Sequence, residues 1–340
     1  PQPELPVVEE TYELPAEEQI CELCHGALEE WDGQFEESEE ITVVERKFNL
    51  RKIKRKKYRC QCGGCIKTAP GPLKLIPGGR YSVAFAVEVA IQKYLDHLPL
   101  ERQVRIMKRE GLRTDSQTLW DQIWALSRLV APIYEQLPEH IYSFEAIHAD
   151  ETRWFLLEKG GRKTWQIWCI ASPDAVHYSL LPERSARAGA AALGDYEGTV
   201  VCDGYQVYEK LARDGPYQID LAFCMAHARR KFVDCAPDYP DECKTALDLI
   251  GALYEVERQV PNPWSVEGEE REAAFALRAK LRDEKSRPIA GELKAWALKQ
   301  SGLASSSFIK AVKYLLNHWP GLTRFLDDPK IPIDNNQAER

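Results

Sequence analysis

The amino-acid sequence lacks the apolar runs and the leader segment that mark membrane and secreted proteins. No stretch of its 340 residues approaches the roughly 18 apolar positions that a membrane-spanning helix needs. No charged, then apolar, then small-residue signal opens the chain. We therefore expect a soluble, cytoplasmic protein without a membrane partner.

Charge of one sign is missing from two neighbouring stretches. Residues 1–40 contain fourteen acidic side chains and no lysine or arginine, whereas residues 46–80 contain twelve lysines or arginines and no acid. The formal net charge of −8 averages over this asymmetry. A function that depends on positive charge is therefore expected to be local.

Composition and length predict a folded protein with more than one domain. The chain is 44% hydrophobic and 10% aromatic, which is ample for packed cores. Single cores stop growing at about 250 residues, so we expect two or three domains. The expected segments are a tether at 1–20, a cysteine-rich module at 21–68, a linker at 69–81, a helical domain at 82–140, an α/β core at 141–224, a helical segment at 225–325 and the start of a helix at 326–340.

Hydrophobic spacing distinguishes the helical domain from the α/β core. In the helical domain apolar residues recur every three or four positions, and the turn EGLRTD separates a helix at 100–109 from one at 116–137. This is a helix-turn-helix outline, which suits DNA binding. In the core a helix near 186–193 follows three strand-like runs and precedes a fourth, which predicts a mixed α/β sheet. The four strand-like runs are 144–158, 162–173, 175–184 and 198–205.

Two Cys-x-x-Cys pairs in the module at 21–68 predict a structural zinc site. Such a pair lets both sulfurs of one turn reach a single zinc ion. The 37 residues between the pairs exceed the usual gap of a zinc ribbon, so buried free thiols in a reducing compartment are the alternative. The expected ligands are Cys21, Cys24, Cys62 and Cys65, with Cys60 as a substitute for Cys62.

Two cationic clusters are candidates for DNA contact. Residues 46–59 hold nine cations in fourteen positions, interrupted by Phe48, Ile53 and Tyr58, which we interpret as anchors that fix the backbone. The alternative for either cluster is a solvated face, but a basic stretch inside a zinc module favours phosphate contact. The candidate DNA-binding residues are Arg51, Lys52, Lys54, Arg55, Lys56, Lys57 and Arg59, together with Arg229, Arg230 and Lys231.

Three carboxylates are positioned to share a divalent metal. Asp150 ends the apolar run AIHAD and Asp203 ends TVVCD, so we expect both at strand ends, where a carboxylate costs little if a metal meets it. Pro332 and Asp334 suggest a helix entrance that places Glu339 about one turn inside a helix. Carboxylates from two strands and a helix suit magnesium or manganese and phosphoryl transfer. Ordinary strand-end aspartates are the alternative.

Taken together, the motifs resemble those of the insertion sequence 66 family of DDE transposases, which are bacterial mobile-element enzymes. The matching pieces occur in the family's order and cover residues 21–340. They are CELC, CQCGGC with TAPGP, KYLDHLPLERQ, HADETRW, VCDGYQVY, CMAHARRKF and DNNQAER.

This resemblance implies an RNase H-like core with Asp150, Asp203 and Glu339 as its acidic triad, bound to Mg²⁺ or Mn²⁺. It implies that residues 225–325 are a helical insertion and that residues 326–340 begin the catalytic C-terminal helix. His227 falls on a Cys-x-x-His element similar to one near the active site of many DDE enzymes, with its role open. The implied partners are transposon-end and target DNA, a homo-oligomer on DNA and accessory proteins of the element, at the bacterial nucleoid.

Two functions are compatible with these motifs. The first is a transposase that cleaves DNA at transposon ends and transfers the strands into target DNA. The second is a zinc-dependent DNA-binding regulator or an inactive transposase remnant. Members of the family continue beyond the glutamate and carry a region before the zinc module, so we expect a chain truncated at both ends. The three carboxylates favour the enzyme, and the stop at Arg340 favours the remnant.

Overall fold

The structure is a computed structural model in which the chain forms two compact units. One unit comprises Pro1–Gly71 with Leu98–Ser116, and the other comprises Pro72–His97 with Gln117–Arg340. The cysteines of the predicted zinc site, Cys21, Cys24, Cys60, Cys62 and Cys65, lie outside the described residues. The described ranges are 25–27, 48–59, 66–158, 161–215, 217–303 and 305–339.

The first unit contains a short antiparallel ribbon and one helix in its described part. Strand β1 (Lys57–Arg59) pairs with β2 (Ile66–Thr68), and helix α2 spans Leu100–Arg109. In the cationic stretch, residues 48–56 form neither strand nor helix, and the partner strand of β1 follows the second cysteine group. A run of like charges offers no apolar face to bury, so nothing sets the register of a longer hairpin there.

The second unit begins with helices. They are α1 (Val83–Tyr94), α3 (Ser116–Tyr134) and α4 (Leu137–Tyr142). The hydroxyl of Ser82 caps α1 by accepting a hydrogen bond from the Phe85 backbone N–H at 3.2 Å. At the other end of this segment, the Tyr134 hydroxyl donates to the Tyr178 carbonyl at 2.8 Å and accepts from the Tyr178 N–H at 2.9 Å. These bonds attach the end of α3 to the edge of the sheet.

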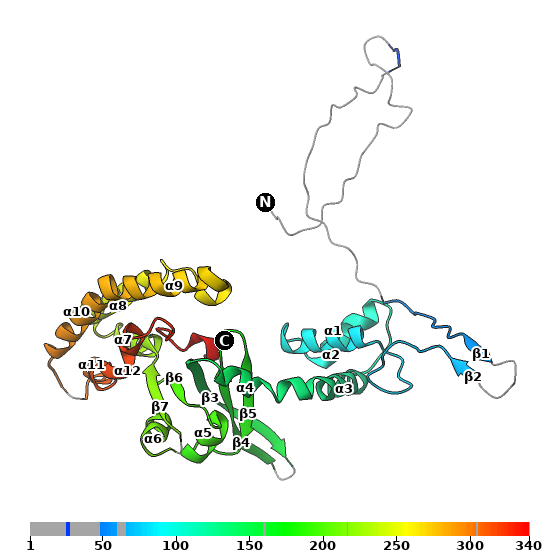
Figure 1. Ribbon diagram of the computed structural model, residues 1–340, viewed down its shortest axis with the longest axis horizontal. Coiled ribbons are helices and arrows are strands. Elements are labelled where there is room, and N and C mark those ends of the chain that lie inside the picture. The colour runs from blue at the N-terminus through cyan, green and yellow to red at the C-terminus, as the bar shows by residue number, and fades with distance from the viewer. Residues whose placement is uncertain are drawn as a thin grey trace. The chain divides into compact units, whose positions relative to one another are not determined.

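A five-stranded mixed sheet forms the centre of the second unit (Figure 1). Its order is β5-β4-β3-β6-β7, in which β3, β4 and β5 are an antiparallel meander and β6 and β7 run parallel to β3. The predicted α/β class is confirmed, but the fifth strand was not anticipated from sequence. The strands are β3 (Ala146–Glu158), β4 (Gly161–Ala171), β5 (Val176–Leu181), β6 (Gly198–Cys202) and β7 (Ile219–Phe223).

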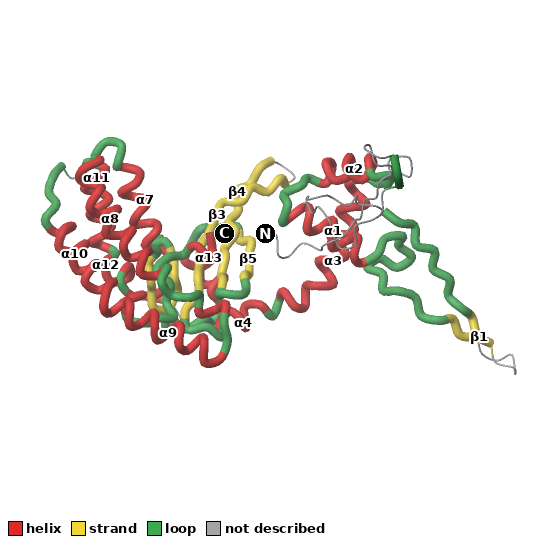
Figure 2. Tube along the Cα trace, turned by 90° about the horizontal axis from the view of Figure 1, so that it is seen from above, coloured by secondary structure: helices red, strands yellow, loops and turns green. Residues whose placement is uncertain are grey.

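Helices connect the parallel strands and then follow them without further strands in the described residues. Helix α5 (Ala186–Leu193) leads into β6, and α6 (Gln206–Asp214) leads into β7. Helices α7, α8, α10 and α11 lie together beyond the β7 edge of the sheet (Figures 1 and 2). None of the helices that the structure describes is long and apolar enough to cross a membrane. The later helices are α7 (Met225–Cys235), α8 (Pro240–Glu257), α9 (Gly268–Leu281), α10 (Arg287–Leu298), α11 (Ser307–Asn317), α12 (Trp319–Leu322) and α13 (Asn336–Glu339), with a π-helical turn at Arg282–Ser286 and 3-10 turns at Pro263–Ser265 and Arg324–Leu326.

The hydrophobic core lies between the sheet and the helices. Trp168 on β4 is 2% exposed and packs in this core. Trp154 on β3 is instead 49% exposed. The reason is the length of β3, which pairs with β6 only at its first three residues and then extends with β4 past the covered part of the sheet.

Candidate active site

Asp150 and Asp203 are brought together by the register of two parallel strands. Strand β3 pairs with β6 from Ala146 opposite Thr199 to His148 opposite Val201. Continued by two residues, the same register sets Asp150 opposite Asp203, and opposed residues of parallel strands point to one face. Asp150 was predicted at a strand end. It lies inside the long strand β3 instead, just beyond the point where β6 stops pairing, so its carboxylate faces the end of β6.

The turn after β6 fixes the carboxylate of Asp203. Its Oδ1 accepts the Tyr205 backbone N–H at 2.8 Å, and the Tyr314 hydroxyl donates to its carbonyl oxygen at 2.7 Å. Gly204 has φ +84°, in the left-handed region, and a Cβ there would lie 3.1 Å from the His318 ring. Only glycine takes this backbone conformation and this space without strain, so the sequence DGY sets the direction of Asp203.

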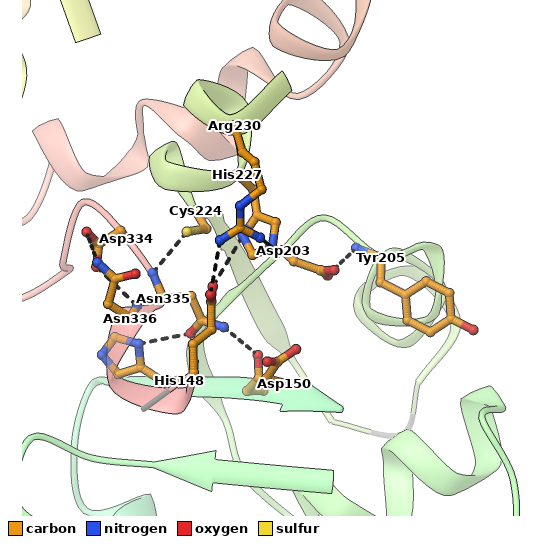
Figure 3. A network of polar contacts seen from close by, with 12 residues as sticks. His148, Asp150, Asp203, Tyr205, Cys224, His227, Arg230, Asp334, Asn335 and Asn336 are labelled. Atoms are coloured by element: carbon orange, nitrogen blue, oxygen red, sulfur yellow. Dashed lines mark hydrogen bonds and ion pairs between the residues drawn. The ribbon is translucent and has the colours of Figure 1, made fainter. Parts of the chain in front are cut away.

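Glu339 reaches the same cluster from α13. The Asp334 carboxylate accepts the Asn336 backbone N–H at 3.1 Å. Helix α13 begins at Asn336, so Glu339 lies in its first turn. Glu339 Oε1 lies 3.4 Å from His227 Nδ1, and Oε2 lies 3.5 Å from the Arg230 guanidinium. Both contacts come from α7, on the side of the cluster away from β3 (Figure 3).

Asn335 holds the start of α13 against the sheet. Its side chain is fully buried, and its Nδ2 donates to the Ala149 carbonyl at 2.9 Å. Its Oδ1 lies 3.0 Å from His148 Nδ1, so His148 donates this bond from a protonated Nδ1. Its backbone N–H donates to Cys224 Sγ at 3.2 Å. Three distant segments thus meet at one amide beside Asp150 (Figure 3).

Glu151 is a buried carboxylate that the sequence analysis did not single out. It follows Asp150 directly, and its side chain is fully buried. Arg184 donates to its Oε1 from Nε at 2.9 Å and from the terminal nitrogen, and the Tyr208 hydroxyl donates to its Oε2 at 2.9 Å. Burial raises the pKa of Glu151, whereas these bonds favour its charged form. The only sequence signal was a second acid beside Asp150.

The carboxylates interact electrostatically. The pKa of Asp150 is raised from 3.8 to about 6, mainly by burial and also by the negative charges of Glu151, Asp203 and Glu339, against the Glu151 N–H that lowers it. The charge of Asp203 also contributes to the raised pKa of Glu151. Like charges gathered in this way favour a proton or a metal ion between them.

The raised pKa of Asp150 predicts how the metal-free protein responds to pH. Its carboxyl keeps a proton up to about pH 6 when folded but loses it near 3.8 when unfolded, so the folded state binds more protons in that window. Folding stability that Asp150 contributes should therefore fall as pH rises through the window, and Asp150→Asn should flatten the profile. Thermal melts of both proteins between about pH 4.5 and pH 7.5 measure this. Equal slopes would contradict the raised pKa.

Cys224, His227 and Glu339 are the group of three potential ligands in the described residues whose ligand atoms all lie within 4.8 Å of one another, a distance that Asp150, Asp203 and Glu339 do not all meet. The thiol of Cys224 is not prepared for a metal, because burial raises its pKa to about 11 and it accepts the Asn335 N–H. His227 is the better candidate ligand, since its Nδ1 faces Glu339. The spacing of the Cys-x-x-His element in the sequence did not reveal this contact between His227 and Glu339.

The two cationic clusters differ in structure. In the first, residues 51–58 are exposed on extended backbone, and Arg55 donates to the Ala69 carbonyl at 2.6 Å. Ile53 and Tyr58 were expected to be anchors but are 44% and 61% exposed, because no apolar layer faces them. In the second, Arg229, Arg230 and Lys231 are exposed on α7. Both clusters are exposed, and their contact with DNA stays a prediction.

Comparison with known proteins identifies the group to which these motifs belong. The model of the transposase IS66 family matches residues 78–340, which include the whole candidate site. The chain belongs to this family. The match includes each of the three carboxylates, Asp150, Asp203 and Glu339.

Three uncharacterized proteins of Sinorhizobium fredii are relatives of the chain. The protein y4jD is 33% identical over 345 residues, y4hP 27% over 348 residues and y4qI 32% over 321 residues. These alignments cover 95%, 94% and 89% of this chain but 65%, 61% and 58% of the relatives. The chain therefore spans about three fifths of the length of these family members.

Proposed function

We propose that the chain contains the catalytic core of a DDE transposase, which cleaves DNA at transposon ends and joins the freed strands to target DNA. The observation that carries the proposal is the cluster of Asp150, Asp203 and Glu339, in which two charges raise the pKa of the third carboxylate. Membership of the IS66 family supports it. The sheet order, a three-stranded meander extended by two parallel strands, supports an RNase H-like core.

The donor set of the cluster fits a hard divalent cation. Asp150 and Asp203 each accept one backbone N–H, at 2.9 Å and 2.8 Å, which orients their carboxylates. Of the two guanidinium groups at the site, Arg184 pairs with Glu151, outside the triad, and Arg230 lies 3.5 Å from Glu339. Three oxygen donors with a shared excess of negative charge favour Mg²⁺ or Mn²⁺ over zinc.

Each part of the site has a physical role in this reaction. Mg²⁺, when bound, would polarise the phosphodiester and lower the pKa of an attacking water or 3′-hydroxyl. Asp150 and Asp203 would hold it from two fixed strands, and Glu339 from α13. The pair of Glu151 and Arg184 fixes the strand beside Asp150, so that the carboxylates need little reorganisation when DNA binds.

DNA recognition is proposed for other parts of the chain. The exposed cations at 51–57 are suited to phosphate contact, which adds affinity without sequence preference. Helices α2 and α3 are the helices of the predicted helix-turn-helix outline, which would read the transposon ends. We also propose a homo-oligomer on DNA, because joining two transposon ends requires two active sites.

The proposed activity is tested by nicking of labelled transposon-end DNA. A chain extended to the length of its relatives should nick this DNA in Mg²⁺ or Mn²⁺ and not in a buffer without divalent metal. The 340-residue chain is assayed beside it. If the extended chain binds end DNA but never cleaves it under any divalent metal, the protein is a DNA-binding remnant and the proposal is wrong.

A structural zinc is proposed for the cysteine module. Zinc in such modules supplies about 10–16 kcal/mol of folding free energy, which a module this small needs. We expect one zinc per chain by metal analysis, lost in Cys65→Ser. Cys62→Ser should lose it and Cys60→Ser should retain it if Cys62 is the ligand, and the reverse result assigns Cys60. A protein purified without zinc would contradict the site.

A further inference from the structure

An open groove with a volume of about 580 Å³ lies on the surface between α7 and α8. This volume is in the range of sites that hold ligands. Asn336 of α13 also lines the groove, three residues before Glu339 of the proposed active site. The lining residues are Ala226, Arg229, Arg230, Val233, Gly251, Tyr254, Glu255, Arg258 and Asn336.

Positive charge dominates the groove. Three guanidinium groups line it, against the single carboxylate of Glu255, which pairs with Arg258 at 3.1 Å. Arg229 makes no ion pair with any residue in the described ranges. Arg230 has only long contacts, 3.5 Å to Glu339 and 3.5 Å to His227 Nε2. Since a guanidinium carries five N–H donors, most of this donor capacity is free for an anion.

We propose that this groove binds the phosphodiester backbone of the DNA strand that enters the active site. This inference rests on the proposed function, and it assigns the surface along which DNA reaches the active site. Arg230 connects the two sites, because it lines the groove and also contacts Glu339. A phosphate held by Arg229 and Arg230 would therefore be followed along the strand by one near the carboxylates.

The neighbouring cation Lys231 is excluded from this path. Its ammonium lies 5.5 Å from the centroid of the Tyr314 ring on α11, and it does not line the groove. Arg258, which is 27 residues further along the chain than Lys231, does line it. In the sequence, Arg229, Arg230 and Lys231 form one cluster. In the structure, the third cation of the groove is Arg258, from the end of α8, and not Lys231. The groove thus combines side chains of α7 with side chains of α8 and of the residue that follows it.

Matched charge-removing variants test the groove. Arg229→Gln and Arg258→Gln are compared with Lys231→Gln by fluorescence anisotropy of labelled duplex and single-stranded end DNA over a range of salt. Each groove variant should reduce the slope of log affinity against log salt by about one, whereas Lys231→Gln should keep the wild-type slope. All three side chains are exposed, so unchanged thermal melts are expected and confirm that the variants are folded.

The outcomes separate the groove from the proposed function. If Arg229→Gln and Arg258→Gln keep the wild-type slope, or if Lys231→Gln lowers it equally, the groove is not the DNA path, and Mg²⁺-dependent nicking by the wild type would still stand. If the groove variants lose slope while the wild type binds but never nicks DNA, the groove is supported and the catalytic proposal fails. If the wild type binds no DNA, both are overturned.

Discussion

Asp150→Asn and Asp203→Asn are each expected to reduce Mg²⁺-dependent cleavage by roughly 10³-fold or more, because metal stabilisation of a phosphoryl-transfer transition state is worth several kcal/mol. DNA affinity should stay near the wild-type value, since neither side chain lies in a basic cluster. The residues are suited to this test because the register of β3 and β6 sets them opposite each other. Cleavage is measured on labelled end DNA in a chain of the relatives' length, and binding by anisotropy.

Asp220→Asn is the matched control for these variants. Asp220 lies on β7 of the same sheet, but its side chain is 64% exposed and pairs with Arg324 at 3.2 Å, outside the carboxylate cluster. The Asp220→Asn protein should cleave DNA at the wild-type rate. Calorimetric titration with Mn²⁺ gives a second measurement, in which Asp150→Asn and Asp203→Asn should lose affinity for the metal and Asp220→Asn should not. If Asp203→Asn cleaved as fast as Asp220→Asn, Asp203 would not belong to the metal site.

Local patterns in the sequence predicted most of the sheet and the positions of the two aspartates. The runs AIHAD and TVVCD are apolar and β-branched, and each is followed by polar residues, so strand position could be inferred from composition. Strand β7 was missed because IDLAF has a single β-branched residue and an acid at its second position, whereas β6 of the same length has the β-branched run TVV. The length of β3 was predicted, since the strand-like run at 144–158 contains the whole of Ala146–Glu158.

The supporting contacts of the site could not be predicted, since they join residues that are distant in sequence. His148 and Asn335 are 187 positions apart, and neither residue type signals a partner. Arg184 reads as an ordinary polar residue after a strand, and only the fold shows that it neutralises Glu151. For the same reason, the sequence could not predict which of Arg229, Arg230 and Lys231 line the groove, because spacing on a helix does not tell which side of the helix faces a groove.

Arg282 is a buried cation that connects the helical segment to the chain leading to Glu339. Its side chain is 1% exposed, and it donates to both oxygens of Glu257 at 2.7 Å and 2.8 Å. One terminal nitrogen also donates to the backbone carbonyls of Phe325, Asp328 and Ile331. These carbonyls belong to the segment just before α13. A single guanidinium in the π-helical turn thus satisfies a carboxylate and three carbonyls that would otherwise be buried without donors.

Arg282→Met is therefore expected to destabilise the protein by about 3–5 kcal/mol, because it leaves the Glu257 carboxylate with only the longer contact to Arg278, at 3.6 Å, in a poorly solvated site. For a unit of this size the melting temperature should fall by roughly 6–20 °C.

Arg287→Met is the control, since Arg287 is 46% exposed and its pairs with Asp283 and Asp327 lie at the surface, where such pairs are worth about 1 kcal/mol or less. Adding Glu257→Leu to Arg282→Met should recover part of the loss, because the uncompensated charge is then gone. Calorimetry of the four proteins measures these differences. A fall in Arg282→Met no larger than that in Arg287→Met would show that the buried guanidinium does not hold the segment before α13.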